Sequence, residues 1–376
     1  MANRTALLLL LCWAPLITFA QDWTQTMRRA GFEQIHVLQS QDSLTIFFEH
    51  RPFRNPFHSF QYAQRLLKGE EDRVITWVPL YNNRPMGAYS GHELQFRQVS
   101  QKEKIYFKRH NNLAKGYRFH FRIMPDFQGR FGRFDKPLET KTNIIIDSRL
   151  YLLPGLSLQS GLLFPVQNSL DVREESIRLA PSHLHYFSQW QSSFFLSLTA
   201  GTFYSDRYGF DLQLRYAPLD RPWSVGIEGG YTGFYYIEKG VLYSEELGDL
   251  LLIGDVEYRL PITNLSVKLS AGQFLFEDIG ARAEVIRQFG GVDVGLFVSR
   301  TERGSTAGFQ FAFPLFPGKI FRTNKVELRT TEEFRWEYSY SNRPVARKYR
   351  LGIPRLSDQL RQYNMFFIQD QVEQAQ

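Results

Sequence analysis

Cysteine is nearly absent from this chain of 376 residues. Its one cysteine, Cys12, lies within the first twenty positions, a segment that we expect to be removed from the mature protein. The mature chain would then have no disulfide bonds, no zinc site with cysteine ligands and no cysteine nucleophile. This agrees with an oxidising compartment but does not require one.

Catalytic motifs are missing as well. The sequence contains no G-x-S-x-G, no H-E-x-x-H and no glycine-rich loop that would cradle a phosphate. His183 and His185 have the spacing of a metal-binding pair on a strand, but no third ligand is evident, so we interpret them as loop histidines. We therefore expect no catalytic residue, no cofactor and no metal. A serine–histidine–acid hydrolase leaves no local signature of this kind and stays an alternative.

The chain has no long apolar run after Ala20. Arg4 and the apolar stretch that follows it are typical of a signal peptide, cleaved before Gln21. A retained membrane anchor is the alternative, whereas the bulky Leu11 before Cys12 argues against a lipoprotein signal. No later stretch reaches the roughly 18 apolar residues of a helical span. An exported chain of this kind can cross a membrane as a closed β-barrel, in which every backbone group is paired.

Large aromatic residues are abundant instead. Phe, Tyr and Trp make up 15% of the chain, with 33 Phe and 19 Tyr. A barrel that faces lipid, with aromatic girdles at both interfaces, uses such rings more than a soluble core does. The formal net charge of +7 becomes +6 when Arg4 leaves (7 − 1 = 6). In an exported protein this balance suits outer-membrane lipid headgroups, an acidic polysaccharide or a merely solvated surface, and the export itself argues against nucleic acid as a partner.

Residues 21–87, after the signal peptide at 1–20, mix helical and alternating patterns. We predict from them a small α/β module that precedes the barrel and lies in the periplasm or partly in the lumen. Strand-like alternation covers 32–38, 44–48 and 74–80, and helical spacing covers 23–31 and 57–68.

Residues 88–341 alternate with period two in segments of about ten residues, the length of a tilted strand that crosses a bilayer. In one of them Phe210 and Leu212 alternate with Asp211 and Gln213. We predict an all-β transmembrane barrel of about 12–14 antiparallel strands, with its apolar side toward lipid. A soluble β-sandwich would alternate in the same way, but the signal peptide, the aromatic content and the number of segments favour the barrel. Short turns are expected at 153–155, 217–220, 261–264 and 289–291.

The charged sides of these strands would line the lumen. They carry both signs, which is more typical of a plugged or hydrated lumen than of an ion-selective ring. Asp255 and Glu257 could be mistaken for a glycosidase pair, but neighbouring inward residues of this kind are common in barrels. The predicted lumenal polar residues are Arg118, His120, Arg122, Asp211, Arg215, Asp255, Glu257 and Arg259.

Residues 342–376 break the alternation. They are charged and polar, with several Arg and Gln, and do not end on an aromatic strand. We predict a polar C-terminal tail rather than a final barrel strand.

Four charged residues lie close together around a glycine turn: Asp278, Arg282, Glu284 and Arg287. Arg282 and Glu284 share one face of a strand, and Asp278 begins the turn. One interpretation is a lumenal cluster that contacts glycan hydroxyls or carboxylates, in which arginine forms paired hydrogen bonds to the carboxylates of acidic sugars. The other, which we favour, is a salt-bridge network that holds the strands and the turn.

Residues 271–315 carry a recognisable pattern. The chain here resembles the YjbH/GfcD-like family of outer-membrane barrels, whose pattern is G-x-Y-x-x-x-D-x-G, then R-x-F-x-N-G-x-x-x-G, then a strand that ends in P-L. Phe274 stands where the family has tyrosine, and Gly290 stands where it has asparagine. The matching segments are 271–274, 277–282, 287–292, Gly295, Thr301 and 308–315, with a weaker match at 153–158, Gly161 and Pro165.

This resemblance implies a location in the cell outer membrane and a part in the export or handling of exopolysaccharide or capsular polysaccharide. It also implies periplasmic export components as partners, while the acidic polysaccharide follows from the basic charge balance. Two alternatives stay open, which are a general passive pore and a barrel hydrolase that acts on lipid or glycan.

Overall fold

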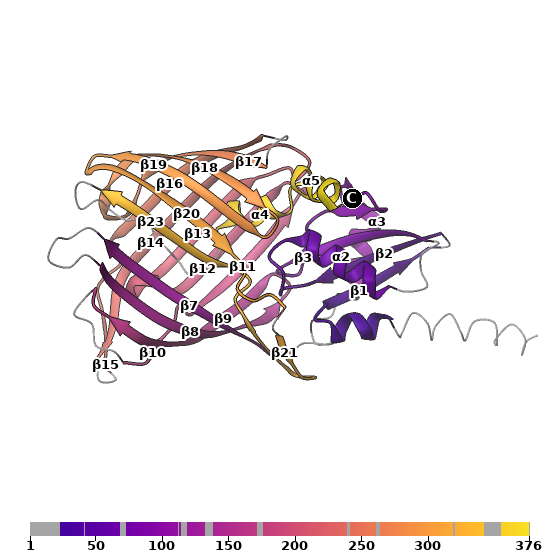
Figure 1. Cartoon of the computed structure of the whole chain (residues 1–376), viewed down its shortest axis with the longest axis horizontal. Helices are drawn as coiled ribbons and strands as arrows, with labels where there is room; N and C mark the ends of the chain where they lie inside the picture. Colours follow the sequence, from indigo (N-terminus) through magenta and orange to yellow (C-terminus); the bar gives the residue numbers. More distant parts are fainter. Residues whose placement is uncertain are drawn as a thin grey trace, which may run out of the picture.

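The computed structural model shows a mostly β protein with a large curled sheet and a smaller module at one end of it (Figure 1). The expected signal peptide and Arg118 lie outside the described residues. Within the described part of the chain, no helix is long and apolar enough to cross a membrane. The structure describes residues 23–40, 42–67, 73–111, 113, 119–131, 138–170, 176–238, 241–260, 264–318, 320–341 and 355–375.

The module is built around a βαβ unit, in which β2 and β3 pair in parallel and α2 connects them. Asn55 starts α2 because its side chain accepts a hydrogen bond from the backbone N–H of Phe57, and Pro56 follows at the first helical position. The elements are β1 (Glu33–Gln39), β2 (Ser43–Glu49), α2 (Pro56–Leu66), β3 (Val74–Tyr81), β4 (Arg84–Pro85), β5 (Ala88–Ser90), β6 (Gln95–Arg97) and α3 (Gln101–His110), after a helical segment at 23–29.

The expected boundary at residue 87 is too early. β5 pairs with β3, β6 pairs with β5, and the sheet order is β1-β2-β3-β5-β6. Helix α3 then packs Phe107 against Phe47 of the same module. β5 and β6 are three residues long each, too short to show a period in the sequence.

The large sheet is antiparallel along most of its course. Its strand order is β7-β8-β9-β11-β12-β13-β14-β16-β17-β18-β19-β20-β23. The strands are β7 (Phe119–Phe131), β8 (Leu138–Leu153), β9 (Leu156–Asn168), β11 (His183–Trp190), β12 (Phe194–Phe203), β13 (Arg207–Tyr216), β14 (Trp223–Glu238), β16 (Asp249–Leu260), β17 (Leu265–Gln273), β18 (Ile279–Phe289), β19 (Val292–Thr301), β20 (Gly304–Phe313) and β23 (Phe334–Ser341). Short additions are β10 (Arg178–Leu179), β15 (Val241–Ser244), β21 (Ile320–Arg322), β22 (Val326–Thr330), η1 (Tyr204–Asp206) and η2 (Leu275–Glu277).

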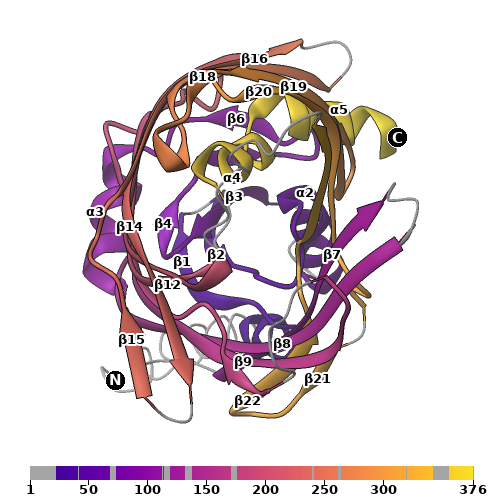
Figure 2. The same cartoon turned by 90° about the vertical axis from the view of Figure 1, so that its left-hand side faces the viewer.

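A seam lies where the two ends of this sheet meet. β22 runs parallel to the start of β7, from Val326↔Phe119 to Thr330↔Ile123. Thr331 then donates its backbone N–H to the carbonyl of Ile123, after which the chain continues as β23 beside β20. Among the residues that the structure describes, β22 pairs with the first part of β7, whereas β23 pairs with β20. The two ends of the sheet are therefore joined by a strand ladder at the module end (Figure 2).

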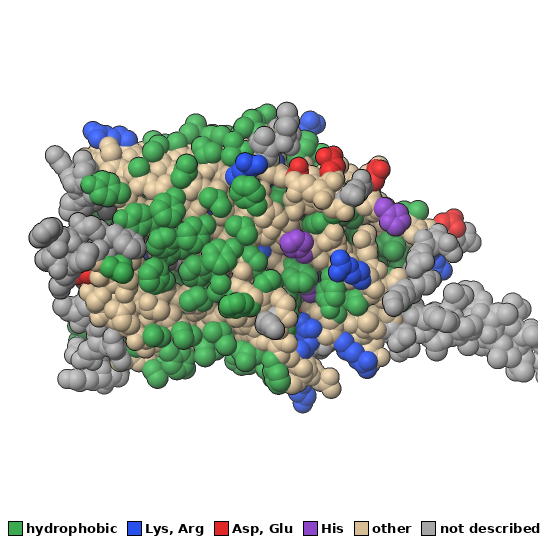
Figure 3. All heavy atoms as spheres, in the orientation of Figure 1, with side chains coloured by type: hydrophobic (Ala, Val, Ile, Leu, Met, Phe, Trp, Pro, Cys, Tyr) green, Lys and Arg blue, Asp and Glu red, His purple; other side chains and the backbone are tan. Residues whose placement is uncertain are grey.

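The two faces of the sheet differ in the way that the alternation predicts. On β13, Asp211 and Arg215 are buried inside the ring, whereas Phe210 is 54% exposed and Leu212 is 40% exposed. Apolar side chains cover the outside of the wall (Figure 3). A period of two places every second side chain on the same face, so each strand has one polar and one apolar side.

The turns predicted at 153–155 and 289–291 lie at the end of the sheet that carries the module. Arg84 donates to the carbonyl of Pro154 at 3.1 Å, and Asn55 donates to that of Gly290 at 3.1 Å. Gly155 follows Pro154 with φ +85°, and a Cβ there would lie 2.3 Å from the carbonyl oxygen of Phe187. A larger residue cannot occupy this position without moving the backbone of β11.

The predicted polar tail is wrong for residues 355–375. They form α4 (Leu356–Gln362), which lies inside the curled sheet, and α5 (Met365–Ala375), which lies at the module end (Figures 1 and 2). α4 buries Leu356 and Leu360 against Phe187 and Phe195 of the sheet. α5 adds its own apolar residues to the core of the module, so the C-terminal helices connect the two parts.

Candidate functional site

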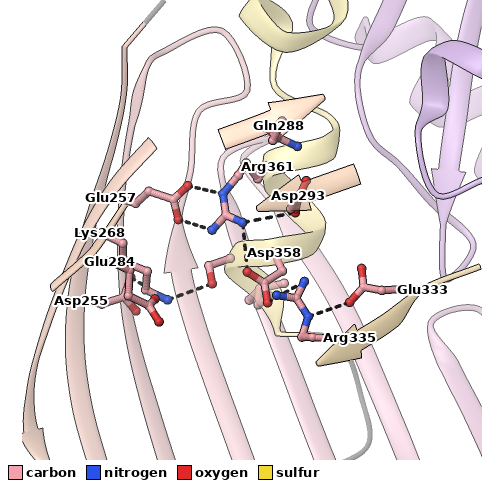
Figure 4. Close-up of polar contacts among 12 residues, drawn as sticks. Asp255, Glu257, Lys268, Glu284, Gln288, Asp293, Glu333, Arg335, Asp358 and Arg361 are labelled. Carbon is pink, nitrogen blue, oxygen red and sulfur yellow. Dashed lines mark hydrogen bonds and ion pairs between the residues drawn. The ribbon is translucent and has the colours of Figure 1, made fainter. Parts of the chain in front are cut away.

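The side chain of Arg361 is the centre of a charged network inside the ring, which we call the lumenal network (Figure 4). Its guanidinium donates to both carboxylate oxygens of Glu257 on β16, at 2.6 and 2.9 Å. The same group donates to Asp358 one turn earlier on α4 at 3.1 Å and lies 3.8 Å from Asp293 on β19. A forked contact of this kind fixes the direction of the helix as well as its position.

The network continues into the module. Asp358 also contacts Arg335 on β23 at 3.2 Å, and Arg335 contacts Glu333 at 3.0 Å. Arg54 of the module donates to Glu333 at 2.6 Å and to Asp293 at 2.5 and 3.0 Å. The charges thus run from the sheet through α4 to the segment that precedes α2, and they bind all three parts together.

Burial and charge act in opposite directions on the helix residues. Burial by itself raises the pKa of Asp358, but Arg335 and Arg361 hold that pKa well below its usual range. Burial likewise lowers the pKa of Arg361, whereas Glu257 and Asp358 hold it well above its ordinary value. Both groups therefore stay charged, and each depends on its partners because an unpaired buried charge is costly.

A second group of contacts follows the first turn of α4. Lys268 on β17 donates to the hydroxyl of Ser357 at 3.0 Å and lies 3.6 Å from Asp255. Asp255 also accepts from Arg215 of β13. These contacts place the start of α4 against the inner wall, on the side formed by β13, β14, β16 and β17.

The module reaches the opposite wall through His120 on β7. Its Nε2 lies 2.5 Å from Glu33 of the module, and its Nδ1 lies 3.2 Å from Glu327 on β22. Burial raises the pKa of Glu33, but Arg51 and His120 outweigh it and lower that pKa. The seam of the sheet is thus tied to β1 by the polar contacts of His120 with Glu33 and Glu327.

The structure brings together some of the sequence-predicted residues and separates others. Arg215, Asp255, Glu257 and Arg259 surround α4, and the backbone carbonyl of Arg361 accepts from Arg259 at 3.1 Å. Asp211 lies near the start of α4, since it accepts from Gln213, whose side chain accepts from the backbone N–H of Leu356. Arg122 of β7 lies on a separate part of the wall, where it pairs with Asp147 and Glu332.

The expected cluster around the glycine turn is only partly formed. Arg282 donates to Glu284 at 2.6 Å and reaches Glu337 on β23 at 3.0 Å. Asp278 is buried at the far end of the strand, where it accepts from the backbone of Arg303. Arg287 does not belong to the cluster, because its odd spacing from Arg282 and Glu284 turns it to the outer face, over the ring of Phe289.

His183 and His185 do not lie in a loop, as the sequence suggested. Both are buried on β11, and Nε2 of His185 lies 3.0 Å from the hydroxyl of Ser197 on β12. In the described ranges, no three His, Asp or Glu side chains are placed to hold a metal ion.

Several residues of the lumenal network escaped the sequence analysis. Asp293 could have been found, because its parity on β19 matches the inward set of neighbouring strands. Arg54 and Arg361 could not, because nothing local indicates that a module loop and a distal helix enter the ring. The remaining missed members are Glu333, Arg335 and Asp358.

No curated protein matches the sequence of this chain. Among solved structures, OmpTdeltaL8, a loop L8 deletion mutant of OmpT, an outer membrane protein of Vibrio cholerae, is similar at 8% identity and a TM-score of 0.31. The match covers 60% of this chain and 92% of that one, and it is too weak to support an argument. The sequence model of the YjbH family, described as exopolysaccharide biosynthesis protein YbjH, matches residues 17–313, which is most of the chain, and the protein therefore belongs to this family.

Proposed function

We propose that this protein is an outer-membrane β-barrel that takes part in the export or handling of exopolysaccharide or capsular polysaccharide. The observation that carries the proposal is the family match over residues 17–313, since the family is described by exopolysaccharide biosynthesis. The apolar outer wall and the charged interior support the membrane location, and the module and α4–α5 would then face the periplasm.

A row of aromatic rings supports a membrane boundary near the module end of the wall. Trp190 stacks on Phe194, Phe194 lies beside Tyr216, and Tyr216 lies beside Trp223, with centroid distances of 5.8, 4.8 and 5.4 Å. Girdles of Trp and Tyr mark both interfaces of outer-membrane barrels. In this proposal the ring of strands closes fully in lipid, because unpaired strand edges there are costly.

The lumenal network argues against a general passive pore. α4 lies inside the ring with Arg361 paired to Glu257, and the module lies across the same end (Figure 2). A wide aqueous channel would need this end to open. We therefore expect low conductance in planar bilayers, whereas a steady large conductance would favour the pore.

We further propose a role without catalysis. The carboxylates that a hydrolase would use, Asp255 and Glu257, are engaged by Arg215 and Arg361. Hydrolysis of lipid or glycan by the purified protein, abolished by one substitution inside the ring, would instead support the hydrolase.

The proposal is tested by deleting the gene in its host and measuring surface polysaccharide as uronic acid and total sugar. We expect a loss that the intact gene restores. Heat-modifiable migration of the purified protein on a gel tests the barrel separately. Unchanged surface polysaccharide would overturn the export role, and a protein that folds as a monomer without detergent would overturn the membrane location.

A further inference from the structure

A cleft of about 440 Å³ lies where the module meets the turns of the sheet, outside the lumenal network. We call it the junction cleft. Its walls come from the β4–β6 region and α3 of the module and from three turns of the sheet, at Pro154, at 189–193 and at 219–220. Its size is in the range of ordinary ligand pockets, roughly 300–1,000 Å³.

One side of α3 supplies cations to the cleft. Lys104, Lys108 and Asn111 line it, and their spacing of four and three residues puts them on the same side of the helix. Ser100 and Glu103 form a capping box that fixes the start of α3. Lys104 also reaches across the cleft, where its Nζ donates to the hydroxyl of Ser192 at 2.9 Å.

Arg84 supplies a third cation from the module. One of its terminal nitrogens donates to the carbonyl of Pro154 at 3.1 Å, which fixes the guanidinium at the cleft wall. Its Nε is buried and has no hydrogen-bond acceptor in the described part of the chain. A buried donor without an acceptor costs about 1–3 kcal/mol, so a ligand oxygen that accepts from it would be favoured.

The cleft also has the uncharged groups that a sugar needs. The ring of Phe96 packs over Gly87, whose φ is +109°, and a Cβ at that position would lie 2.5 Å from the ring. Gln189 and Gln191 add amides from the β11–β12 turn. Amides can donate to and accept from hydroxyls, and a flat ring suits the apolar face of a pyranose.

The lining carries three cations, Arg84, Lys104 and Lys108, against one acidic residue, Asp220. We propose that the junction cleft binds a short stretch of an anionic polysaccharide whose sugars carry carboxylates. The cations would pair with the carboxylates, while the amides and Phe96 would hold the sugar rings. This inference deepens the proposed function, on which it rests, by naming a ligand class and a site. Lipid phosphate would need the cations alone, whereas amides and a ring next to them favour a sugar.

The experiment uses the full mature chain in detergent micelles, with trigalacturonic acid as the probe and maltotriose as its neutral counterpart. Binding is measured by isothermal titration calorimetry. The test variant is K104E/K108E, and the matched control is K102E/R109E. The control makes the same charge change on the same helix, at residues that do not line the cleft.

We expect the probe to bind the native chain and to bind K104E/K108E at least roughly tenfold more weakly. A tenfold loss corresponds to the loss of one charge-assisted hydrogen bond. The control should stay within about twofold, and maltotriose should bind much more weakly than the probe. Equal weakening in both variants, or equal binding of both sugars, would overturn the inference. Binding of phosphatidylglycerol vesicles that K104E/K108E abolishes, without binding of the probe, would assign the cleft to lipid instead.

The two proposals can fail separately. If the native chain binds no uronate but the deletion strain loses surface polysaccharide, the cleft assignment falls and the export role stands. If the cleft binds the probe as expected but the deletion strain keeps its polysaccharide, the export role falls.

Discussion

The two C-terminal helices are held differently. α4 meets the inner wall of the sheet through charges, with Arg361 against Glu257, in addition to the apolar contacts of Leu356 and Leu360, whereas α5 meets the module through apolar packing, with Ile368 and Val372 in its core. The difference follows from the surfaces that receive them. The inner face of the sheet is largely polar, so a helix that enters the ring needs charged groups there, apart from the apolar patch at Phe187 and Phe195. The module has its own hydrophobic core, which α5 can extend.

Substitution of Arg361 should disrupt the charged contacts of α4 most strongly. In R361M, Glu257 and Asp358 lose a buried partner, which we expect to cost about 3–5 kcal/mol and to release α4. Limited proteolysis of the C-terminal segment and planar-bilayer conductance measure the release. The matched variant R361M/E257Q also removes the unpaired charge of Glu257 and should recover part of the lost stability. Unchanged protease resistance in R361M would show that apolar packing alone holds α4.

The apolar half is tested at Ile368, which is fully buried in the core of the module. We expect I368A to destabilise the module by about 3 kcal/mol, because it leaves a cavity. Denaturant titration of the full chain in detergent, followed by the fluorescence of the buried Trp77, measures this loss. E373A on the exposed side of α5 is the control and should change little. Equal effects of the two substitutions would mean that α5 does not pack as described.

The module also contains a buried histidine, His50, whose proton uptake differs between the folded and the unfolded chain. Burial lowers the pKa of His50 to about 3, and its Nδ1 lies 2.9 Å from the hydroxyl of Ser59. Between pH 6.5 and 3 the unfolded chain binds a proton at this residue and the folded one does not, so stability falls as pH falls through that window. We expect a loss of about 2 kcal/mol from pH 8 to pH 5, and a smaller slope in H50Q. An identical slope in both proteins would exclude His50 as the source.

The smallest effect is expected where a charge faces outward. Arg282 and Arg287 lie on the same strand, but Arg282 is paired inside the ring and Arg287 is exposed over Phe289. R287A should change the free energy of unfolding by less than about 0.5 kcal/mol, the usual range for surface substitutions. R282A should cost clearly more, and a reversed order would contradict the inward and outward assignment of β18. Reversible urea unfolding and refolding of each variant in lipid vesicles gives both free energies of unfolding.

Local patterns in the sequence were enough for much of this structure. Alternation placed Asp211, Arg215 and Glu257 on the inner face, because the period of a strand fixes which side each residue takes. The same spacing rule excludes Arg287 from the cluster, because Arg287 lies an odd number of residues from both Arg282 and Glu284. The strands at 32–38, 44–48 and 74–80 and the helix at 57–68 also agree with β1, β2, β3 and α2 to within a few residues.

The site itself depended on contacts that no local pattern encodes. Arg361 and Glu257 are 104 positions apart, and Arg54 and Asp293 are 239 apart, so each pair forms only after the strands have curled and the module has docked. A polar C-terminal sequence suits a solvated tail and a charged lumen equally well, since both surround it with polar groups. By itself the sequence determined which face of each strand is polar, because that follows from backbone geometry. Only the tertiary structure decided that α4 enters the ring, because its charges needed partners from distant strands before they could be buried.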